Sequence, residues 1–135
     1  MTRADIVLQG KYSEYEALQG FIALFAERED YSVQFVERLQ LSLKEAFVNA
    51  VRHGNRKQED LTVSCGLLAA ENILLASVHD CGNGFNPDEL PDPLGSAHLF
   101  NLSGRGIYII KSIAEIISME RDEDGSVLTL RYIPY

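Results

Sequence analysis

The sequence has no tryptophan and only two cysteines, Cys65 and Cys81, in 135 residues. Two cysteines this far apart form neither a zinc knuckle nor a Cys-x-x-Cys redox pair, so we interpret them as reduced thiols. No apolar run approaches the ~18 residues that would span a bilayer, and the N-terminus has none of the blocks of a signal peptide. These absences predict a cytoplasmic protein with no membrane contact.

Positive charge is also scarce, because 12 Lys and Arg residues stand against 20 Asp and Glu residues, for a net charge of −8. The field of the whole molecule repels nucleic acid, so we expect no direct nucleic-acid binding. Anions can still bind locally, through backbone amides, a divalent cation or an isolated Arg. The apolar share of 46% is that of an ordinary globular protein.

Internal repeats and Gly/Ser linkers are missing as well, which predicts a single domain over residues 1–135. A Ser13 and Glu16 capping box is expected to open a first helix, and a longer helix runs from about Ser32 to His53. The run 107–117 is β-branched and could be a strand, but its length favours a third helix. Alternating hydrophobicity predicts a strand at 61–67, and a more continuously apolar run predicts its hairpin partner at 72–79. Residues 4–9 form a further expected short strand, and a turn at 122–125 predicts a second hairpin of 118–121 and 126–133.

This order of elements predicts an α+β fold, a two-layer sandwich whose mixed, mostly antiparallel sheet is covered on one face by helices. Between the second hairpin strand and the third helix, residues 82–103 show no periodicity. So long an irregular stretch is usually functional or disordered, and we interpret residues 85–103 as a lid.

Three polar clusters lie at the ends of predicted elements. Glu45, Asn49 and His53 follow one edge of the second helix at a spacing of four. Asp80-Cys81-Gly82-Asn83-Gly84 follows a strand, and Ser103-Gly104-Arg105-Gly106 precedes the third helix. Each cluster alone is more often a wet helix face, a tight turn or a flexible entry.

Together the clusters supply what a nucleotide with a divalent cation needs. Asp80 can accept a hydrogen bond from an adenine amino group. Asn49 offers an oxygen to Mg²⁺, and the amides from Gly104 onward can receive phosphate oxygens at a helix start. Neither a P-loop nor a Rossmann fingerprint is present.

These residues resemble the histidine-kinase-like (GHKL) ATPase superfamily, which includes DNA gyrase, Hsp90, MutL and bacterial histidine kinases. The matching boxes are Glu45-Ala-Phe-Val-Asn49-Ala-Val-Arg-His53-Gly54, Asp80-Cys-Gly82-Asn-Gly84 and Ser103-Gly104-Arg105-Gly106. Within the superfamily the chain is similar to the bacterial anti-sigma-factor serine/threonine kinases, which also share the Pro91-Asp92-Pro93 of the lid.

The resemblance implies a cytoplasmic kinase that uses ATP and Mg²⁺. It implies Glu45 as general base and Arg105 as the fixed positive charge. Asn49 would be the metal ligand, and nucleotide contacts would come from Asn49, His53, Asp80, Gly82, Gly84, Gly104 and Gly106. Ser126 or Thr129 could reach the adenine from the last strand, and the sequence leaves both open.

The partners that this resemblance implies are a small anti-sigma-factor antagonist, phosphorylated on Ser or Thr, and a sigma factor held inactive. A homodimer is a further implication. The alternative is a nucleotide-gated binding module, in which ATP orders the lid and presents a partner surface without phosphoryl transfer.

Overall fold

The computed structural model describes residues 1–55, 58–81, 102–123 and 125–135. Most of the expected lid, including Pro91-Asp92-Pro93, lies outside the described residues, as do Gly82 and Gly84.

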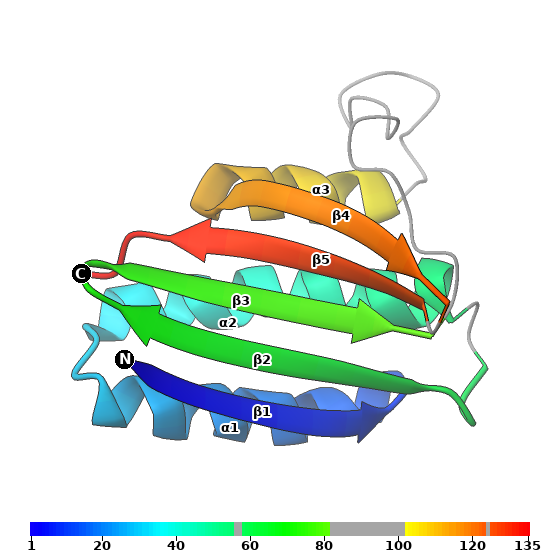
Figure 1. Cartoon of the computed structure of the whole chain (residues 1–135), viewed down its shortest axis with the longest axis horizontal. Helices are drawn as coiled ribbons and strands as arrows, with labels where there is room; N and C mark the ends of the chain where they lie inside the picture. Colours follow the sequence, from blue (N-terminus) through cyan, green and yellow to red (C-terminus); the bar gives the residue numbers. More distant parts are fainter. Residues whose placement is uncertain (56–57, 82–101, 124) are drawn as a thin grey trace.

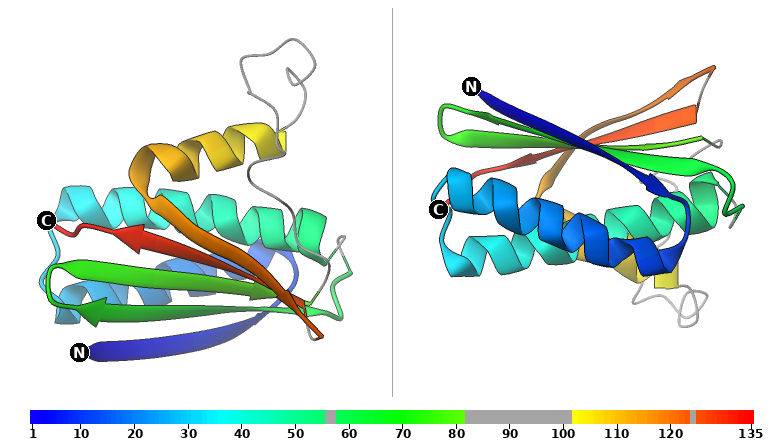
Figure 2. Two further views of the ribbon diagram at one scale, coloured as in Figure 1. Left: turned by 45° about the horizontal axis from the view of Figure 1, so that its top comes forward. Right: turned by 90° about the horizontal axis from the view of Figure 1, so that it is seen from below.

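The described residues form two layers, a five-stranded sheet and a layer of helices on one of its faces (Figures 1 and 2). The strand order is β1-β2-β3-β5-β4, and every pair of neighbours is antiparallel. The strands are β1 (Thr2–Gln9), β2 (Thr62–Ala70), β3 (Ile73–Asp80), β4 (Glu115–Asp122) and β5 (Gly125–Tyr132). The helices are η1 (Tyr12–Glu14), α1 (Tyr15–Arg28), α2 (Val33–Asn49), η2 (Ala50–Gly54) and α3 (Leu102–Ile113).

The start of α1 differs from the prediction. A 3₁₀ turn, η1, occupies Tyr12–Glu14, and the residue that precedes α1 is Glu14, with no side-chain cap hydrogen bond. The predicted Ser13 capping box is therefore wrong, because the 3₁₀ turn takes Ser13 into its own interior. Leu18, Ile22 and Phe25 of α1 are buried, whereas Phe21 is partly buried.

Helix α2 is the central element of the helical layer. Ser32 caps its start, and the Ser32 Oγ accepts a hydrogen bond from the Phe35 backbone N–H at 3.1 Å. Leu39, Leu43 and Phe47 recur at helical spacing on the face of α2 that meets the core, and all three are fully buried. The last turn widens into a π-helix, η2, which ends at Gly54.

The third helix begins five residues earlier than expected and ends four residues earlier. Gly104 and Gly106 therefore belong to the first turns of α3 rather than to a loop before it. Ile116 and Ile117 lie in β4, which begins at Glu115. Their branched side chains suit a strand as well as a buried helix, so the local sequence does not mark the boundary.

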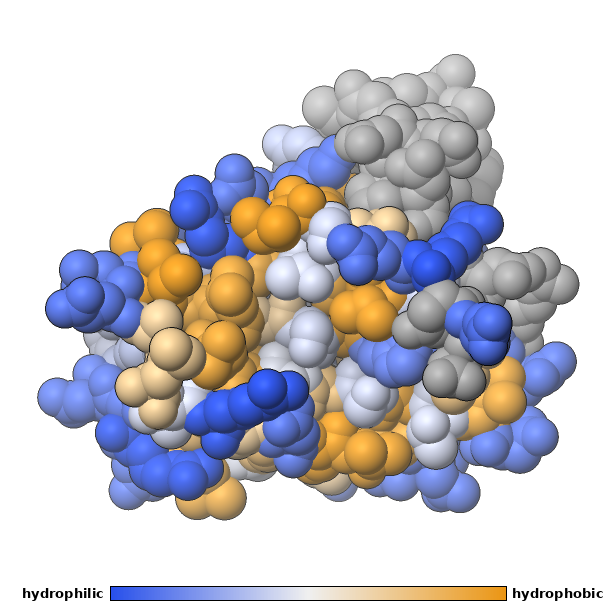
Figure 3. Space-filling model, viewed as in Figure 1, coloured by the Kyte–Doolittle hydropathy of each residue, from blue (hydrophilic) through white to orange (hydrophobic). Residues whose placement is uncertain are grey.

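The outer face of the sheet carries no helix and is chemically mixed, as Figure 3 shows. Exposed Val7 lies on it, and a hollow of about 160 Å³ is lined by Arg3, Asp5, Ser77 and Thr129 among others. The inner face holds the core, where Leu67, Leu74 and Leu130 are buried against the helices. No helix among the described residues is long and apolar enough to cross a membrane.

Candidate active site

Glu45 and Asn49 project from the last turns of α2 toward the beginning of α3. A Cβ atom placed on Gly106 would lie 3.0 Å from the Glu45 carboxylate Oε2 and 3.3 Å from the Asn49 Nδ2. Because Glu45 and Asn49 are four residues apart, both side chains follow the same edge of the helix, as the sequence predicted. Gly106 lets the α3 backbone approach this edge, so the first and third clusters meet here.

The Glu45 carboxyl group is half-buried, and burial raises its pKa. The neighbouring Lys44 partly opposes this shift. The Lys44 ammonium lies 5.8 Å from the centre of the Tyr15 ring, and the Tyr15 hydroxyl donates a hydrogen bond to the Gln40 carbonyl. A carboxylate whose pKa is raised holds a proton more readily, which suits a general base.

Asn49 is 1% exposed, and its Nδ2 has no hydrogen-bond partner among the described residues. A buried amide group normally finds partners, so an orphaned one points to a ligand that completes the site. The side-chain amide also carries a hard oxygen of the kind that Mg²⁺ prefers. The donor set of Asn49 beside Glu45 therefore fits a magnesium ion.

The π-helical turn η2 brings the first cluster to the second. Gly54, at its end, lies so close to β3 that a Cβ atom on it would overlap the Asp80 carboxyl group. Only glycine permits this approach. His53 is half-buried on the same turn. Since Asn49 and Gly54 belong to one continuous helical segment, Asp80 and the Glu45–Asn49 edge lie at the same end of the molecule.

Asp80 is 2% exposed and ends β3, where it pairs with Ser126 of β5. The next residue of β5 on the N-terminal side, Gly125, has φ 146°, and a Cβ atom there would overlap the Asp80 carbonyl. Ser126 is fully buried on the inner face, as Asp80 is, whereas Thr129 lines the hollow on the outer face. Of the two residues that the sequence left open, Ser126 is the one on the side of the site.

Asn55 is a residue that the sequence analysis missed. Its Oδ1 accepts a hydrogen bond from the Cys81 backbone N–H at 2.7 Å, and its Nδ2 donates one to the Thr62 carbonyl at 3.0 Å. The side chain thus ties the end of η2 to β2 and β3 and fixes the backbone that carries Asp80. The only signal in the sequence is its place directly after the helix-ending Gly54.

The remaining predicted residues fall into two groups. Gly104 and Arg105 lie in the first turn of α3, and Arg105 is exposed there. A positive side chain with free amides at a helix start suits a phosphate. The two cysteines are free thiols, as predicted, with Cys65 buried in β2 and Cys81 exposed beside Asp80. Burial, assisted by Asp5, raises the pKa of Cys65 to about 12.

Comparison with protein families matches residues 9–132 to the histidine kinase-like ATPase domain. The chain belongs to this family, and the fold predicted for it is confirmed. Membership of the family implies that the chain binds ATP.

Particular relatives are serine-protein kinases by name. The chain is 26% identical over 114 residues to the serine-protein kinase RsbW of Listeria monocytogenes serovar 1/2a, a match that covers 80% of this chain and 73% of the relative. It is 24% identical to the serine-protein kinase RsbW of Bacillus subtilis strain 168, covering 80% of this chain and 71% of that protein. Both matches include the greater part of each protein.

A solved structure shares the fold. The crystal structure of the RsbU and RsbW domains of a Mycobacterium tuberculosis protein superposes with a TM-score of 0.69 and 13% identity. The match covers 99% of this chain and 33% of that one, so this chain spans about a third of the larger protein.

Proposed function

We propose that this protein is a serine/threonine kinase that transfers the γ-phosphoryl group of Mg²⁺-ATP to a small anti-sigma-factor antagonist and also holds a sigma factor inactive. The observation that carries the proposal is the meeting of Glu45 and Asn49 with the Gly106 backbone of α3, at the same end of the molecule as Asp80. The names of the relatives support the kinase activity, and the sequence resemblance supports the two partners.

The adenine is proposed to lie against Asp80, whose carboxylate accepts a hydrogen bond from the exocyclic amino group. Gly54 and Asn55 hold this carboxylate in place from η2. At the same position guanine carries a carbonyl oxygen, which is an acceptor and cannot donate a hydrogen bond to the Asp80 carboxylate. The protein should therefore prefer ATP to GTP.

The transfer is proposed to depend on three groups around the phosphates. Glu45 takes the proton of the attacking serine or threonine hydroxyl, while the new oxygen–phosphorus bond forms and the bond to ADP breaks. The amide of Gly104 at the start of α3 and the Arg105 guanidinium receive the phosphate oxygens. The Gly106 N–H lies one turn further into the helix and bonds within it, so the part of Gly106 is to let the α3 backbone approach Glu45 and Asn49. Asn49 would hold Mg²⁺, which neutralises phosphate charge when bound.

The test incubates the protein with Mg²⁺-ATP and the antagonist encoded nearby, and phosphoserine or phosphothreonine is measured by mass spectrometry. Glu45→Gln should keep ATP affinity and lower transfer about 10²- to 10⁴-fold, the usual worth of a general base. Asp80→Asn should weaken ATP binding itself. Glu71→Gln is the matched control, because Glu71 is exposed on the β2–β3 turn.

Two outcomes would contradict the proposal. Unmodified antagonist at saturating ATP would rule out the kinase, and ATP-dependent partner binding without transfer would support the nucleotide-gated module instead. Thermal melts supply an independent readout, since a nucleotide at 100 times its dissociation constant should add about 2.7 kcal/mol to the free energy of unfolding.

A further inference from the structure

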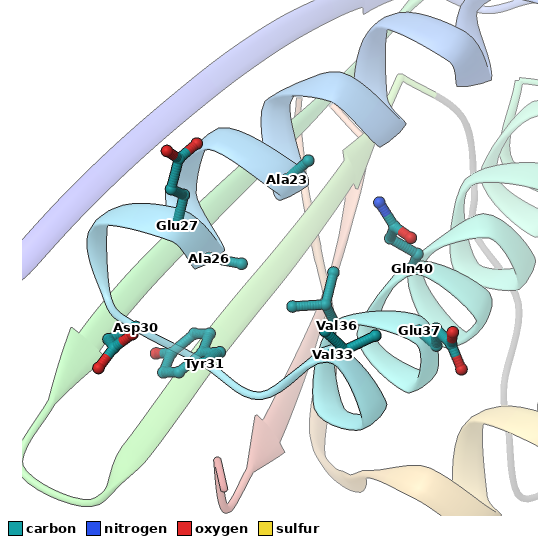
Figure 4. Close-up of a pocket in the computed structure, with 9 residues that line it drawn as sticks. All are labelled: Ala23, Ala26, Glu27, Asp30, Tyr31, Val33, Val36, Glu37 and Gln40. Atoms are coloured by element: carbon teal, nitrogen blue, oxygen red, sulfur yellow. The ribbon is translucent and has the colours of Figure 1, made fainter.

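A groove runs between the C-terminal half of α1 and the first turns of α2, at the end of α2 opposite to the candidate active site (Figure 4). Its volume is about 420 Å³, and pockets that bind small ligands range over about 300–1,000 Å³. Ala23 and Ala26 line it from α1, and Val33 and Val36 line it from α2. The groove is thus apolar between the two helices.

Contacts of the lining residues Tyr31 and Gln40 fix the shape of the groove. The Tyr31 ring, which contributes to the lining, packs against Phe35 edge to face at 5.0 Å and against Phe25 at 6.4 Å. At the other end, the Gln40 side chain donates a hydrogen bond to the Gln19 carbonyl, which joins α2 to α1. A partner would therefore meet a preformed surface and lose little binding energy to ordering it.

The shape of the groove suits a third helix. Val33 and Val36 are one helical turn apart and form an apolar ridge on α2. On α1, Ala23 is exposed, whereas Ala26 is 2% exposed and belongs to the core beneath the groove. The alanines are small and allow a close approach, and Val33 is 71% exposed. An amphipathic helix that lays its apolar face into an apolar groove is a recurring mode of peptide recognition.

The rim of the groove is acidic. Glu27 on α1 and Glu37 on α2 stand on opposite sides of it, and Asp30 lies at its open end (Figure 4). None of the described residues that line the groove is Lys or Arg. Within the part of the chain that the structure describes, these three carboxylates take part in no ion pair. Their charge is available to a partner.

We propose that this groove binds a basic amphipathic helix of a protein partner. Aliphatic side chains of that helix would lie between α1 and α2, and its Arg and Lys side chains would face Glu27, Asp30 and Glu37. A second copy of this chain is a poor occupant, because each copy has a net charge of −8. Val36 and Asn49 are about 20 Å apart along α2, so the groove can be filled while the nucleotide site stays open.

The probe is a synthetic helical peptide with leucines at i, i+3 and i+7 and arginines on both flanks, labelled for fluorescence anisotropy. Saturable binding to the full chain is expected, with affinity that falls as salt screens the charges. Glu27→Lys/Glu37→Lys should weaken binding by at least about tenfold, and so should Ala23→Trp, which fills the groove without changing its charge. Glu59→Lys/Glu120→Lys carries the same charge change on exposed residues, one before β2 and one near the end of β4, at the opposite end of the molecule from the groove, and should bind as the wild type does.

Melting temperatures near that of the wild type must first show that each variant is folded. The proposal is overturned if the peptide does not bind, or if both double variants lose affinity equally, since the attraction would then be general. It is also overturned if Ala23→Trp binds normally, because the peptide would then lie outside the groove. A dimer of the wild type that Ala23→Trp dissociates in sedimentation would assign the groove to a second copy instead. A version of the peptide with glutamates in place of the arginines should not bind.

Discussion

The two ends of α2 differ in their geometry. At its start the geometry is regular, with a Ser32 cap and the Phe35 ring packed against Tyr31, Tyr132 and Tyr135. At its end the helix widens into the π turn η2, leaves the Asn49 Nδ2 without a partner among the described residues, and places Gly54 against Asp80. The π turn and the unpartnered Asn49 Nδ2 of the described residues thus lie together at the end of α2 where a nucleotide is expected.

This contrast agrees with a general tendency. Single π turns inside helices often mark functional sites, because the wider turn aims side chains that a regular turn would not. Here η2 brings Gly54 and Asn55 close to the end of β3. A variant at either end of α2 should therefore show whether stability and nucleotide affinity change together or separately.

The largest effect is expected from Gly54→Ala. The new Cβ atom would overlap the Asp80 carboxyl group, so β3 or η2 must move. Overpacking of this kind costs about 1–3 kcal/mol or more, and the displaced Asp80 should also abolish measurable ATP binding. Chemical denaturation and ATP titration measure the two effects.

Gly20→Ala is the matched control for Gly54→Ala. Gly20 lies inside α1, and an added Cβ atom would meet no atom within 4 Å. Alanine should stabilise the helix there by about 0.5–1 kcal/mol and leave ATP affinity unchanged. Equal effects of the two substitutions would show that the approach of Gly54 to Asp80 has no special role.

Asn55→Leu should have the next largest effect. It removes both hydrogen bonds of the side chain and leaves the Cys81 N–H without its acceptor. A lost buried partner costs about 1–3 kcal/mol, and ATP affinity should fall because Cys81 follows Asp80 directly. Asn55→Asp keeps the acceptor for Cys81, so its ATP affinity should lie between those of Asn55→Leu and the wild type.

Ser32→Ala tests the regular end of α2. Loss of the hydrogen bond from the Phe35 N–H should lower the free energy of unfolding by about 1 kcal/mol. ATP affinity should not change, because Ser32 lies more than four turns from Asn49. A drop in affinity as large as that of Asn55→Leu would mean that the two ends are coupled through the helix.

The sequence predicted those features that depend on local pattern. The burial of Val63, Cys65 and Leu67 follows from their alternation, and the shared edge of Glu45 and Asn49 follows from their spacing. The start of α3 was predicted too late because Gly104 and Gly106 were interpreted as a loop before the helix. Its end was predicted too late because the isoleucines of 107–117 suit helix and strand alike and hide the change to β4.

Features that depend on tertiary contacts could not be predicted from the sequence. The choice between Ser126 and Thr129 is decided by the pairing of Asp80 with Ser126, which local pattern does not determine. The role of Asn55 depends on Cys81 and Thr62, which are distant from each other along the chain but adjacent in the sheet layer. Whether the predicted contacts of Asn49, Asp80 and Arg105 with nucleotide occur stays a prediction.

The smallest effect is expected from Glu45→Gln, which should raise the free energy of unfolding slightly. It tests whether the ionised Glu45 carboxylate, which the proposed chemistry needs, lowers the stability of the fold. Burial raises the pKa of this carboxyl above its ordinary value, so the folded state binds the proton more tightly than the unfolded state does. The contribution of Glu45 to stability is thus present at low pH and is lost as pH rises through the folded pKa. Glu45→Gln should melt slightly higher than the wild type at pH 7. This gain should shrink below about pH 4, where Glu45 is protonated in both states.

Glu71→Gln makes the same change of charge on an exposed turn and should show no such pH-dependent gain. A Glu45→Gln protein that is less stable than the wild type at pH 7 would mean that the ionised carboxylate stabilises the fold, which would remove the argument that this end of α2 gives up stability for chemistry.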